Sequence, residues 1–205
     1  MLAGPAYRIV TDRLILRCYD PRDAPALKAA VDASLEHLAE MPWSREEPQT
    51  LDQKIALLRR FRGLFDLGHD FVYGIFDRDD ATVLGGTGLH MRVGDRAREI
   101  GYWINVAHLN RGVATEAAAA LTRVGFEIDR LARIEIHCGP HNTRSAAVAR
   151  KLGYTHEATL RERAIDAAGN PRDTMIWTLF AADYPRSPCA GRELEAFDAA
   201  GRRIL

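Results

Sequence analysis

A strand, a loop and the start of a helix follow one another near the middle of the chain. They read Glu99-Ile100-Gly101-Tyr102-Trp103-Ile104-Asn105 and then Arg111-Gly112-Val113-Ala114-Thr115-Glu116-Ala117. The helix continues with apolar residues at helical spacing, namely Ala117, Leu121, Val124 and Ile128. The first N–H groups of a helix have no intrahelical acceptor, so a Gly-containing loop that opens a helix can bind an anion. The segment therefore predicts an anion site at 111–116, although a Gly at a helix start also occurs as a plain tight turn.

The rest of the chain predicts alternating helices and strands around this segment. Alternating apolar residues over Thr11–Arg17 indicate a first strand, and helical patterns cover Pro21–Leu38 and Leu51–Leu67. An antiparallel meander is expected over Phe71–Phe76, Val83–Val93 and Glu99–Val106. After the central helix we expect a strand over Ile134–Cys138, a helix over Asn142–Leu152, a strand over Thr174–Phe180, and a small hairpin over Leu194–Ile204 that turns at Ala200-Gly201.

Length and composition indicate one soluble domain. The chain has 205 residues with 47% hydrophobic and 27% charged side chains, which suits a single core. We expect a domain over 1–183 and a C-terminal appendage over 184–205. Lys plus Arg equals Asp plus Glu at 28 each, so no net field favours nucleic acid or an anionic membrane. A small-molecule partner is expected instead.

The cysteines and the N-terminus point to the cytoplasm. Cys18, Cys138 and Cys189 are odd in number and far apart, which fits neither a disulfide framework nor a metal site. No signal-like or membrane-spanning apolar run is present in the sequence. We therefore expect a cytoplasmic protein with reduced thiols and no metal, either a monomer or a homodimer.

Four motifs in order resemble the GNAT acetyltransferases, and within them the RimJ/RimL branch of ribosomal-protein N-terminal acetyltransferases. They are the two quoted above, Asn142-Thr143-Arg144-Ser145, and Lys151-Leu152-Gly153-Tyr154. The opening Thr11-Asp12-Arg13-Leu14-Ile15-Leu16-Arg17 is similar to the same branch. The resemblance implies an α+β fold, a mixed and mostly antiparallel sheet flanked by helices, in which two strands splay apart to admit pantetheine.

The resemblance also implies a cofactor site for acetyl-CoA. The backbone of Trp103, Ile104, Asn105 and Val106 would pair with the pantetheine amides. The pyrophosphate would lie on Arg111, Gly112, Val113, Ala114 and Thr115. Asn142 would hydrogen-bond near the pantetheine arm, although Asn also fits here as a plain helix N-cap.

The sequence departs from the family pattern at two places. The phosphate signature of the family, [QR]-x-x-G-x-[GA], is matched at Gly112 and Ala114, but Leu109 replaces the usual Gln or Arg and Asn110 replaces a frequent second Gly. Many GNAT enzymes also carry a Tyr seven residues after the Asn to protonate the departing thiolate, and here that residue is Ala149. The two departures thus concern the side chains that contact the pyrophosphate and the group that protonates the thiolate.

Acetyl transfer requires a neutral amine, which favours an α-amine over a lysine by about 400-fold at pH 7. Glu99 is the first candidate for the base, directly or through water, and a solvated carboxylate beside Arg96 and Arg98 is the alternative. His90 is the second candidate, against a structural histidine. Ser145 is expected to hydrogen-bond to the thiolate, against an ordinary first-turn serine.

Three further residues have alternative roles. Tyr154 is expected in the core, and Cys138 is expected to be a buried thiol and not a covalent nucleophile. Trp43 is expected to line the acceptor cleft or else to pack as an aromatic corner. The function predicted is transfer of acetyl from acetyl-CoA to a primary amine, either a protein N-terminus or an amino-acid-like metabolite, by direct attack in a ternary complex. The alternatives are a non-catalytic acyl-CoA sensor and an enzyme using a longer donor such as succinyl-CoA.

Overall fold

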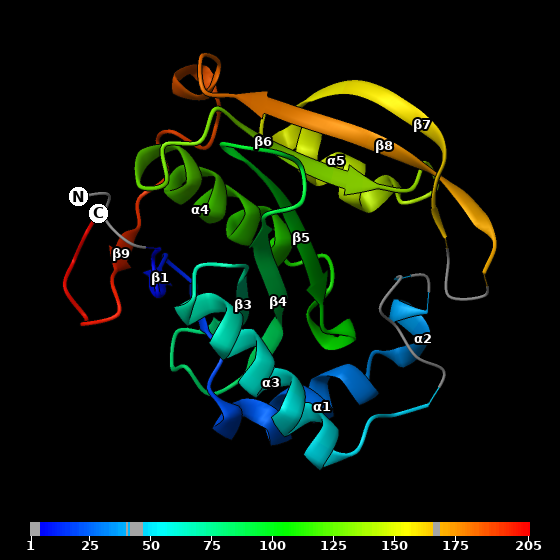
Figure 1. Cartoon of the computed structure of the whole chain (residues 1–205), viewed down its shortest axis with the longest axis vertical. Coiled ribbons are helices and arrows are strands. Elements are labelled where there is room, and N and C mark those ends of the chain that lie inside the picture. Colours follow the sequence, from blue (N-terminus) through cyan, green and yellow to red (C-terminus); the bar gives the residue numbers. More distant parts are fainter. Residues whose placement is uncertain (1–4, 40, 42–46, 166–168) are drawn as a thin grey trace.

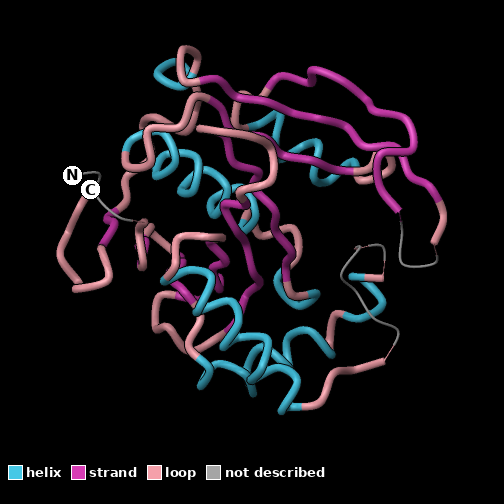
Figure 2. Tube along the Cα trace, in the orientation of Figure 1, coloured by secondary structure: helices cyan, strands magenta, loops and turns pink. Residues whose placement is uncertain are grey.

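The computed structural model describes residues 5–39, 41, 47–165 and 169–205. Within these residues the strands form one sheet in the order β7-β8-β6-β5-β4-β3-β2-β1-β9 (Figure 1). Every neighbouring pair is antiparallel except β5 and β6. Helices lie against the sheet (Figure 2), so the predicted α+β class is confirmed. None of the described helices is long and apolar enough to cross a membrane.

The N-terminal elements are more divided than predicted. The expected strand over 11–17 is a hairpin of β1 (Arg8–Val10) and β2 (Leu14–Cys18). The expected helix over 21–38 consists of η1 (Pro21–Asp23), α1 (Ala24–Asp32) and α2 (Leu35–Leu38). It breaks at Ser34, whose hydroxyl donates to the Ala30 carbonyl, a bond that bends helices. The next helix, α3 (Leu51–Asp66), begins with a capping box between Thr50 and Gln53.

The predicted meander is present as β3 (Phe71–Asp77), β4 (Val83–His90) and β5 (Ala97–Ile104). The strand expected to reach residue 93 ends at His90, and β5 begins two residues before the expected start. Directly paired residues of β4 and β5 are Gly86 with Trp103, Gly88 with Gly101, and His90 with Glu99. Because residues at period two share a face of a sheet, these six positions lie on the same side, where only Trp103, His90 and Glu99 carry side chains.

Strands β5 and β6 (Arg133–Cys138) separate after a short contact. They pair in parallel only from Ala97 with Arg133 to Glu99 with Glu135. Beyond this point β6 continues against β8 alone, and β5 runs on to η2 (Val106–His108) and α4 (Val113–Glu127). The splay expected from the resemblance is therefore present between these two strands.

The C-terminal third adds both ends of the sheet. α5 (Thr143–Lys151) precedes β7 (Thr155–Ile165) and β8 (Pro171–Phe180). No range for β7 could be predicted, because its side chains are mostly exposed and lack apolar alternation. After η3 (Tyr184–Arg186), β9 (Glu195–Phe197) pairs with β1, and Phe197 bridges to Arg203 across a turn that contains Gly201 at φ 74°.

Two apolar layers fill the spaces on either side of the sheet. One packs α4 against the sheet through an unbroken run of buried residues, Ala117, Ala118, Ala119, Ala120 and Leu121. The other packs α1 and α3 against the opposite face through side chains that include Leu27, Val31 and Leu58. The small alanine side chains let α4 approach the sheet closely, which fixes the helix start beside the splay.

Candidate active site

A large cavity of about 2180 Å³ opens at the splay. Its lining comes from β4, β5 and β6, from the start of α4, from α5, and from two outer walls. One wall is the α1–α2 region and the other is the β7–β8 hairpin, which extends beyond the sheet (Figure 1). All of the expected catalytic residues, Glu99, His90 and Ser145, line this cavity.

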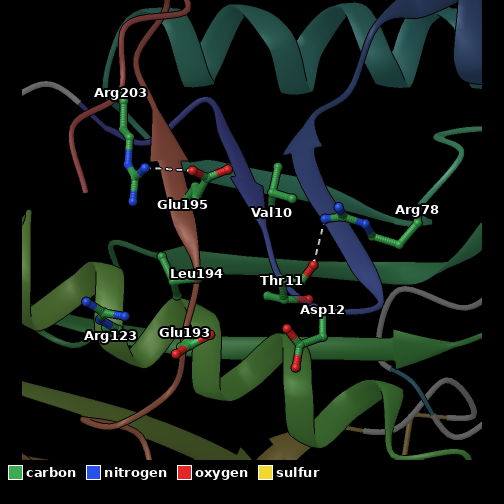
Figure 3. A pocket seen from close by; sticks show the side chains of 9 residues that line it. All are labelled: Val10, Thr11, Asp12, Arg78, Arg123, Glu193, Leu194, Glu195 and Arg203. Atoms are coloured by element: carbon green, nitrogen blue, oxygen red, sulfur yellow. Dashed lines mark hydrogen bonds and ion pairs between the residues drawn. The ribbon is translucent and has the colours of Figure 1, made fainter.

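A second, smaller hollow of about 570 Å³ lies where β1 and β9 meet (Figure 3). Its charged side chains include Arg203, which pairs with Glu195 at 2.7 Å, and Arg78, which donates to the Thr11 carbonyl at 2.7 Å. None of the expected site residues lines it. The chemistry therefore belongs to the larger cavity.

Glycines make the floor of the larger cavity flat on the α1–α3 side. A Cβ added at Gly88 would lie 2.7 Å from the Nε2 and Cε1 atoms of His90, and one at Gly101 would lie 3.2 Å from Nε2. A Cβ at Gly86 would lie 2.5 Å from the Trp103 indole nitrogen. The missing side chains let the His90 and Trp103 rings lie close to the strands. The imidazole thus reaches over the sheet toward the splay.

Asp70 holds His90 in a defined orientation. The His90 Nδ1 atom lies 3.0 Å and 3.1 Å from the two carboxylate oxygens of Asp70, just before β3. Burial would raise the pKa of Asp70, but the hydrogen bond and charge of His90 outweigh it and the pKa lies below its usual value. With Nδ1–H donated to the carboxylate, Nε2 is the lone-pair acceptor. In the described part of the chain, no residue hydrogen-bonds the Nε2 atom of His90.

Glu99 is buried and paired, unlike the solvated carboxylate considered from the sequence. Its side chain is 9% exposed and accepts two hydrogen bonds from Arg92, at 2.6 Å and 2.7 Å. His137 lies next to it, with Nδ1 3.4 Å from Glu99 and Nε2 2.7 Å from Glu135. Both carboxylate oxygens of Glu99 are therefore already engaged by Arg92. Neither Arg96 nor Arg98 is the partner.

Ser145 lies on the α5 side of the splay beside a tyrosine that the sequence did not single out. The Tyr102 hydroxyl is 2.8 Å from Ser145 Oγ. Asn142 caps α5, since its side-chain oxygen accepts from the Ser145 N–H at 3.0 Å, so the N-cap role weighed for it is present. Ala149 is fully buried one turn further on.

The loop before α4 explains one departure from the family pattern. Asn110 has φ 60° and Gly112 has φ 78°, both in the left-handed region. Asn tolerates this region better than most non-glycine residues, so Asn110 keeps the backbone that a Gly would give. Leu109 packs against the main core. Gly112, Val113, Ala114 and Thr115 line the cavity, whereas Arg111 does not.

The β1–β2 turn braces this loop. Arg13 pairs with Glu116 in the first turn of α4 and donates to the Arg111 carbonyl at 3.0 Å. Thr11 donates to the same carboxylate at 2.6 Å. The opening motif of the sequence thus contacts the expected phosphate loop across about a hundred residues of chain, a link that sequence spacing does not reveal.

The expected pantetheine contacts are only partly free. The Asn105 N–H donates to the Leu84 carbonyl at 2.9 Å, and the Val106 N–H donates to the Ser34 hydroxyl at 3.0 Å. Along an antiparallel strand, the backbone N–H and C=O groups of successive residues point to opposite edges. The backbone groups of Trp103 and Asn105 therefore point toward β4, whereas those of Tyr102 and Ile104 point toward the splay. The open backbone edge is therefore centred on Ile104 and Tyr102.

The remaining candidate residues are buried or lie outside the described residues. Tyr154 is 4% exposed in the core, with its hydroxyl 2.7 Å from that of Thr122. Burial raises the pKa of the Cys138 thiol, which keeps it protonated and a poor nucleophile. All three cysteines are buried and free. Among the described residues no group of three or more metal-ligating side chains is assembled. Trp43 lies outside the described residues.

Several contributors could not be found from the sequence. Asp70, Arg92 and His137 are common residue types in no motif, and Tyr102 was visible only as part of a strand. Each becomes notable because the fold brings it beside a candidate residue. The sequence signal was confined to residues that the motifs themselves contain.

A splayed strand pair with an open helix start at its mouth and a large cavity between them are features of an acyltransferase that uses a CoA thioester. The profile of the acetyltransferase (GNAT) domain matches residues 13–155 of the chain. The chain belongs to the GNAT acetyltransferase family, and it is an acyl-CoA-dependent N-acetyltransferase.

Known proteins of similar length resemble this chain in sequence and in fold. The chain is 28% identical over 188 residues to the ribosomal protein uS5-alanine N-acetyltransferase of Escherichia coli, covering 88% of this chain and 94% of that protein. It is 29% identical over 170 residues to the N-acetyltransferase YoaA of Bacillus subtilis, covering 82% and 94%. The structure of RimL, a ribosomal-protein α-N-acetyltransferase in complex with coenzyme A, superposes with a TM-score of 0.75 at 22% identity, covering 83% and 96%.

Proposed function

We propose that this enzyme transfers the acetyl group of acetyl-CoA to the α-amine of a protein N-terminus, with His90 as the general base. The observation that carries the proposal is the Asp70–His90 pair on the floor of a cavity far larger than a small amine needs. His90 accepts the amine proton at Nε2, and Asp70 stabilises the imidazolium that forms.

The size of the cavity supports a macromolecular acceptor. Pockets for small ligands typically hold about 300–1000 Å³, whereas this one holds about 2180 Å³. Pantetheine fills only part of such a volume, which leaves space for several residues of an extended chain. An α-amine also needs less help in losing its proton than a lysine does. The names of relatives such as the uS5-alanine acetyltransferase point to the same acceptor class.

The cofactor is held by backbone and helix dipole more than by side-chain charge. Gly112 to Thr115 present the N–H groups of the α4 start to the cavity, where the helix dipole favours pyrophosphate. Arg144 and Lys151 of α5 also line the cavity and supply cations on its other side. Acetyl-CoA is the proposed donor, and a longer acyl-CoA such as succinyl-CoA is an outcome of the test.

The test measures CoA release and peptide mass with a panel of acceptors. Peptides with a free N-terminus should be acetylated, and the same peptides with a blocked N-terminus and an internal lysine should not. Free amino acids should react much more slowly than the peptides. Preference for free amino acids would replace the protein acceptor with a metabolite, and faster turnover with succinyl-CoA would change the donor.

The base is tested by comparing His90→Ala with Glu99→Gln. General-base catalysis contributes about 10²–10⁴-fold, so His90→Ala should lower turnover by about that factor and leave the Kd for CoA unchanged. Glu99→Gln should cost less, because Glu99 is already paired with Arg92. The matched control is His156→Ala, an exposed histidine that does not line the cavity. A larger loss in Glu99→Gln than in His90→Ala would return the base role to Glu99.

A further inference from the structure

The buried Ala149 leaves the enzyme without the tyrosine that many relatives of this kind use at the departing thiolate. A different tyrosine lies at the same end of the cavity. The Tyr102 hydroxyl is 2.8 Å from Ser145 Oγ, and both residues line the cavity at the splay. Tyr102 comes from β5 and Ser145 from the first turn of α5, so the pair spans the gap that opens between the sheet and the helix.

The alternation of β5 places this pair opposite the base. Gly101 and Trp103 face the α1–α3 side, where His90 lies over Gly88 and Gly101. Tyr102, between them in sequence, faces α5 on the other side. An amine that approaches over His90 would therefore expel the thiolate toward Tyr102 and Ser145. A thioester bound in the splay would therefore have the His90 imidazole on one side and the hydroxyl pair on the other.

The hydrogen-bond geometry assigns a direction to the two hydroxyls. If Ser145 donated to Tyr102, the phenol hydrogen would have only the Ser145 carbonyl, at 3.4 Å. That separation is long for an O–H···O bond. If Tyr102 donates to Ser145 Oγ, the phenol has a short bond and the serine keeps its own hydrogen; the Cys138 sulfur, which Ser145 also contacts, is the other group at this hydroxyl. Burial also raises the pKa of Tyr102, so the phenol stays protonated and remains a donor.

We propose that Tyr102 is a positioning residue that donates to Ser145 Oγ and so aims the serine hydroxyl at the departing CoA sulfur. The inference rests on the proposed direct transfer. In that step the amine nitrogen bonds to the acetyl carbon, the C–S electron pair moves to sulfur, and the amine proton passes to His90. The Ser145 hydroxyl stabilises the thiolate by a hydrogen bond as the negative charge develops.

The test compares Tyr102→Phe with Ser145→Ala and with both changes together. Removing a direct donor to a developing anion costs about 10²–10³-fold in turnover, so the loss of an orienting group should cost about tenfold. Tyr102→Phe should lower kcat with an unchanged Kd for CoA. The double variant should lose no more than Ser145→Ala alone, because Tyr102 acts through Ser145. The matched control is Tyr154→Phe, whose hydroxyl contacts Thr122 instead.

The leaving group provides a readout that a merely structural role would not change. A selenolate is a more stable anion than a thiolate, so acetyl-seleno-CoA should need less hydrogen bonding. The deficit of Tyr102→Phe should therefore shrink to within about twofold with the selenoester, measured as acetylated product by mass spectrometry. Wild-type turnover in Tyr102→Phe, or an equal deficit with both donors, would overturn the proposal.

The acceptor in these assays is whichever amine the wild-type enzyme acetylates fastest. Failure of the peptide acceptor, or full activity in His90→Ala, would thus remove the proposed substrate or base and leave the leaving-group comparison intact. A Tyr102→Phe effect that disappears with the selenoester supports the inference whatever the acceptor is.

Discussion

The orientation of His90 depends on a single carboxylate that lies 20 residues earlier in the chain. The hairpin between β3 and β4 brings Asp70 and His90 together at one end of the meander, where both are partly exposed at the cavity. Asp70 fixes the ring and selects the tautomer with Nε2 free, as an aspartate does in an Asp–His pair of hydrolytic enzymes. The imidazole is effective only in that tautomer.

Replacing Asp70 by Asn should lower turnover by about tenfold, with an unchanged Kd for CoA. The amide keeps the shape of the carboxylate but removes the charge that stabilises the imidazolium. The loss should stay below the 10⁴-fold known for a fully buried pair, because the Asp70 side chain is 28% exposed. Steady-state kinetics and CoA titration check both quantities, and turnover equal to wild type would separate Asp70 from the mechanism.

The same change has an acid-stability consequence. The folded-state pKa of Asp70 lies below its usual value, so its ionised form favours folding. That contribution is present above the unfolded pKa near 3.8 and is lost as pH falls through the folded pKa. The destabilisation caused by Asp70→Asn should therefore be larger at pH 7 than at pH 3 in urea titrations.

Residues inside motifs were predictable, and their partners were not. Glu99, His90 and Ser145 all line the cavity. The pairing of Glu99 with Arg92 joins the two ends of the β4–β5 connection and leaves no periodic signal in the sequence. Tyr102 was hidden for the same reason, since its significance comes from α5 about forty residues later. Tertiary contacts, and not residue types, decide which of these side chains are already paired.

At the level of elements, the β1–β2 turn is the least expected contributor to the cofactor site. Arg13 is bound both to the side chain of Glu116 and to the backbone of Arg111, so it ties the loop to the first turn of α4. A Cβ at Gly112 would lie 3.4 Å from the Arg13 guanidinium. The turn thus holds the loop that presents the N–H groups to the pyrophosphate.

Removing this brace by Arg13→Ala should weaken CoA binding by about fivefold and leave kcat at saturating cofactor unchanged. An exposed ion pair and one hydrogen bond together contribute about 1 kcal/mol, which corresponds to that ratio. Isothermal titration with CoA measures it. Arg186→Ala, which breaks an exposed pair with Asp183 away from the cavity, is the control. A fall in kcat with an unchanged Kd would contradict a role in cofactor positioning.

The elements that the sequence predicted best are those with an apolar face. α3, α4 and the meander appeared close to their expected ranges, because burial against the sheet leaves a periodic record in the sequence. β7 left none, since its exposed side chains carry charges on an edge strand. The division of the helix at Ser34 depends on a side chain that bonds backward to Ala30, a local competition that periodicity does not register.

At the scale of the whole molecule, the sheet is extended from both ends of the chain. β9 hydrogen-bonds to β1 and covers an edge that would otherwise present unpaired backbone groups, and Ala196 within β9 is fully buried. The C-terminal segment expected as an appendage thus shares the sheet and the core of the rest of the chain. On either side of the splay, β5 stays paired with β4 and β6 with β8.

One carboxylate acts on the stability of the whole fold. Asp129 follows the C-terminal end of α4, and burial raises its pKa to about 6, although Arg98 partly offsets the shift. The negative end of the helix dipole disfavours its charge as well. Because the folded pKa lies above the unfolded value of 3.8, folding favours the protonated form. The ionised carboxylate therefore costs stability, and this cost grows as pH rises from the unfolded pKa near 3.8 to about 6 and is complete above it.

Asp129→Asn should raise the free energy of unfolding at pH 8 by roughly 1–3 kcal/mol, the value of a shift of about two pKa units. The gain should fall between pH 6 and pH 4 and vanish below the unfolded pKa, where Asp129 is protonated in both the folded and the unfolded state. Urea denaturation at a series of pH values measures the curve, with Asp95→Asn as the control at an exposed aspartate. A gain that is equal at pH 4 and pH 8 would mean that packing, and not ionisation, is the cause, since only a titrating charge makes the difference depend on pH.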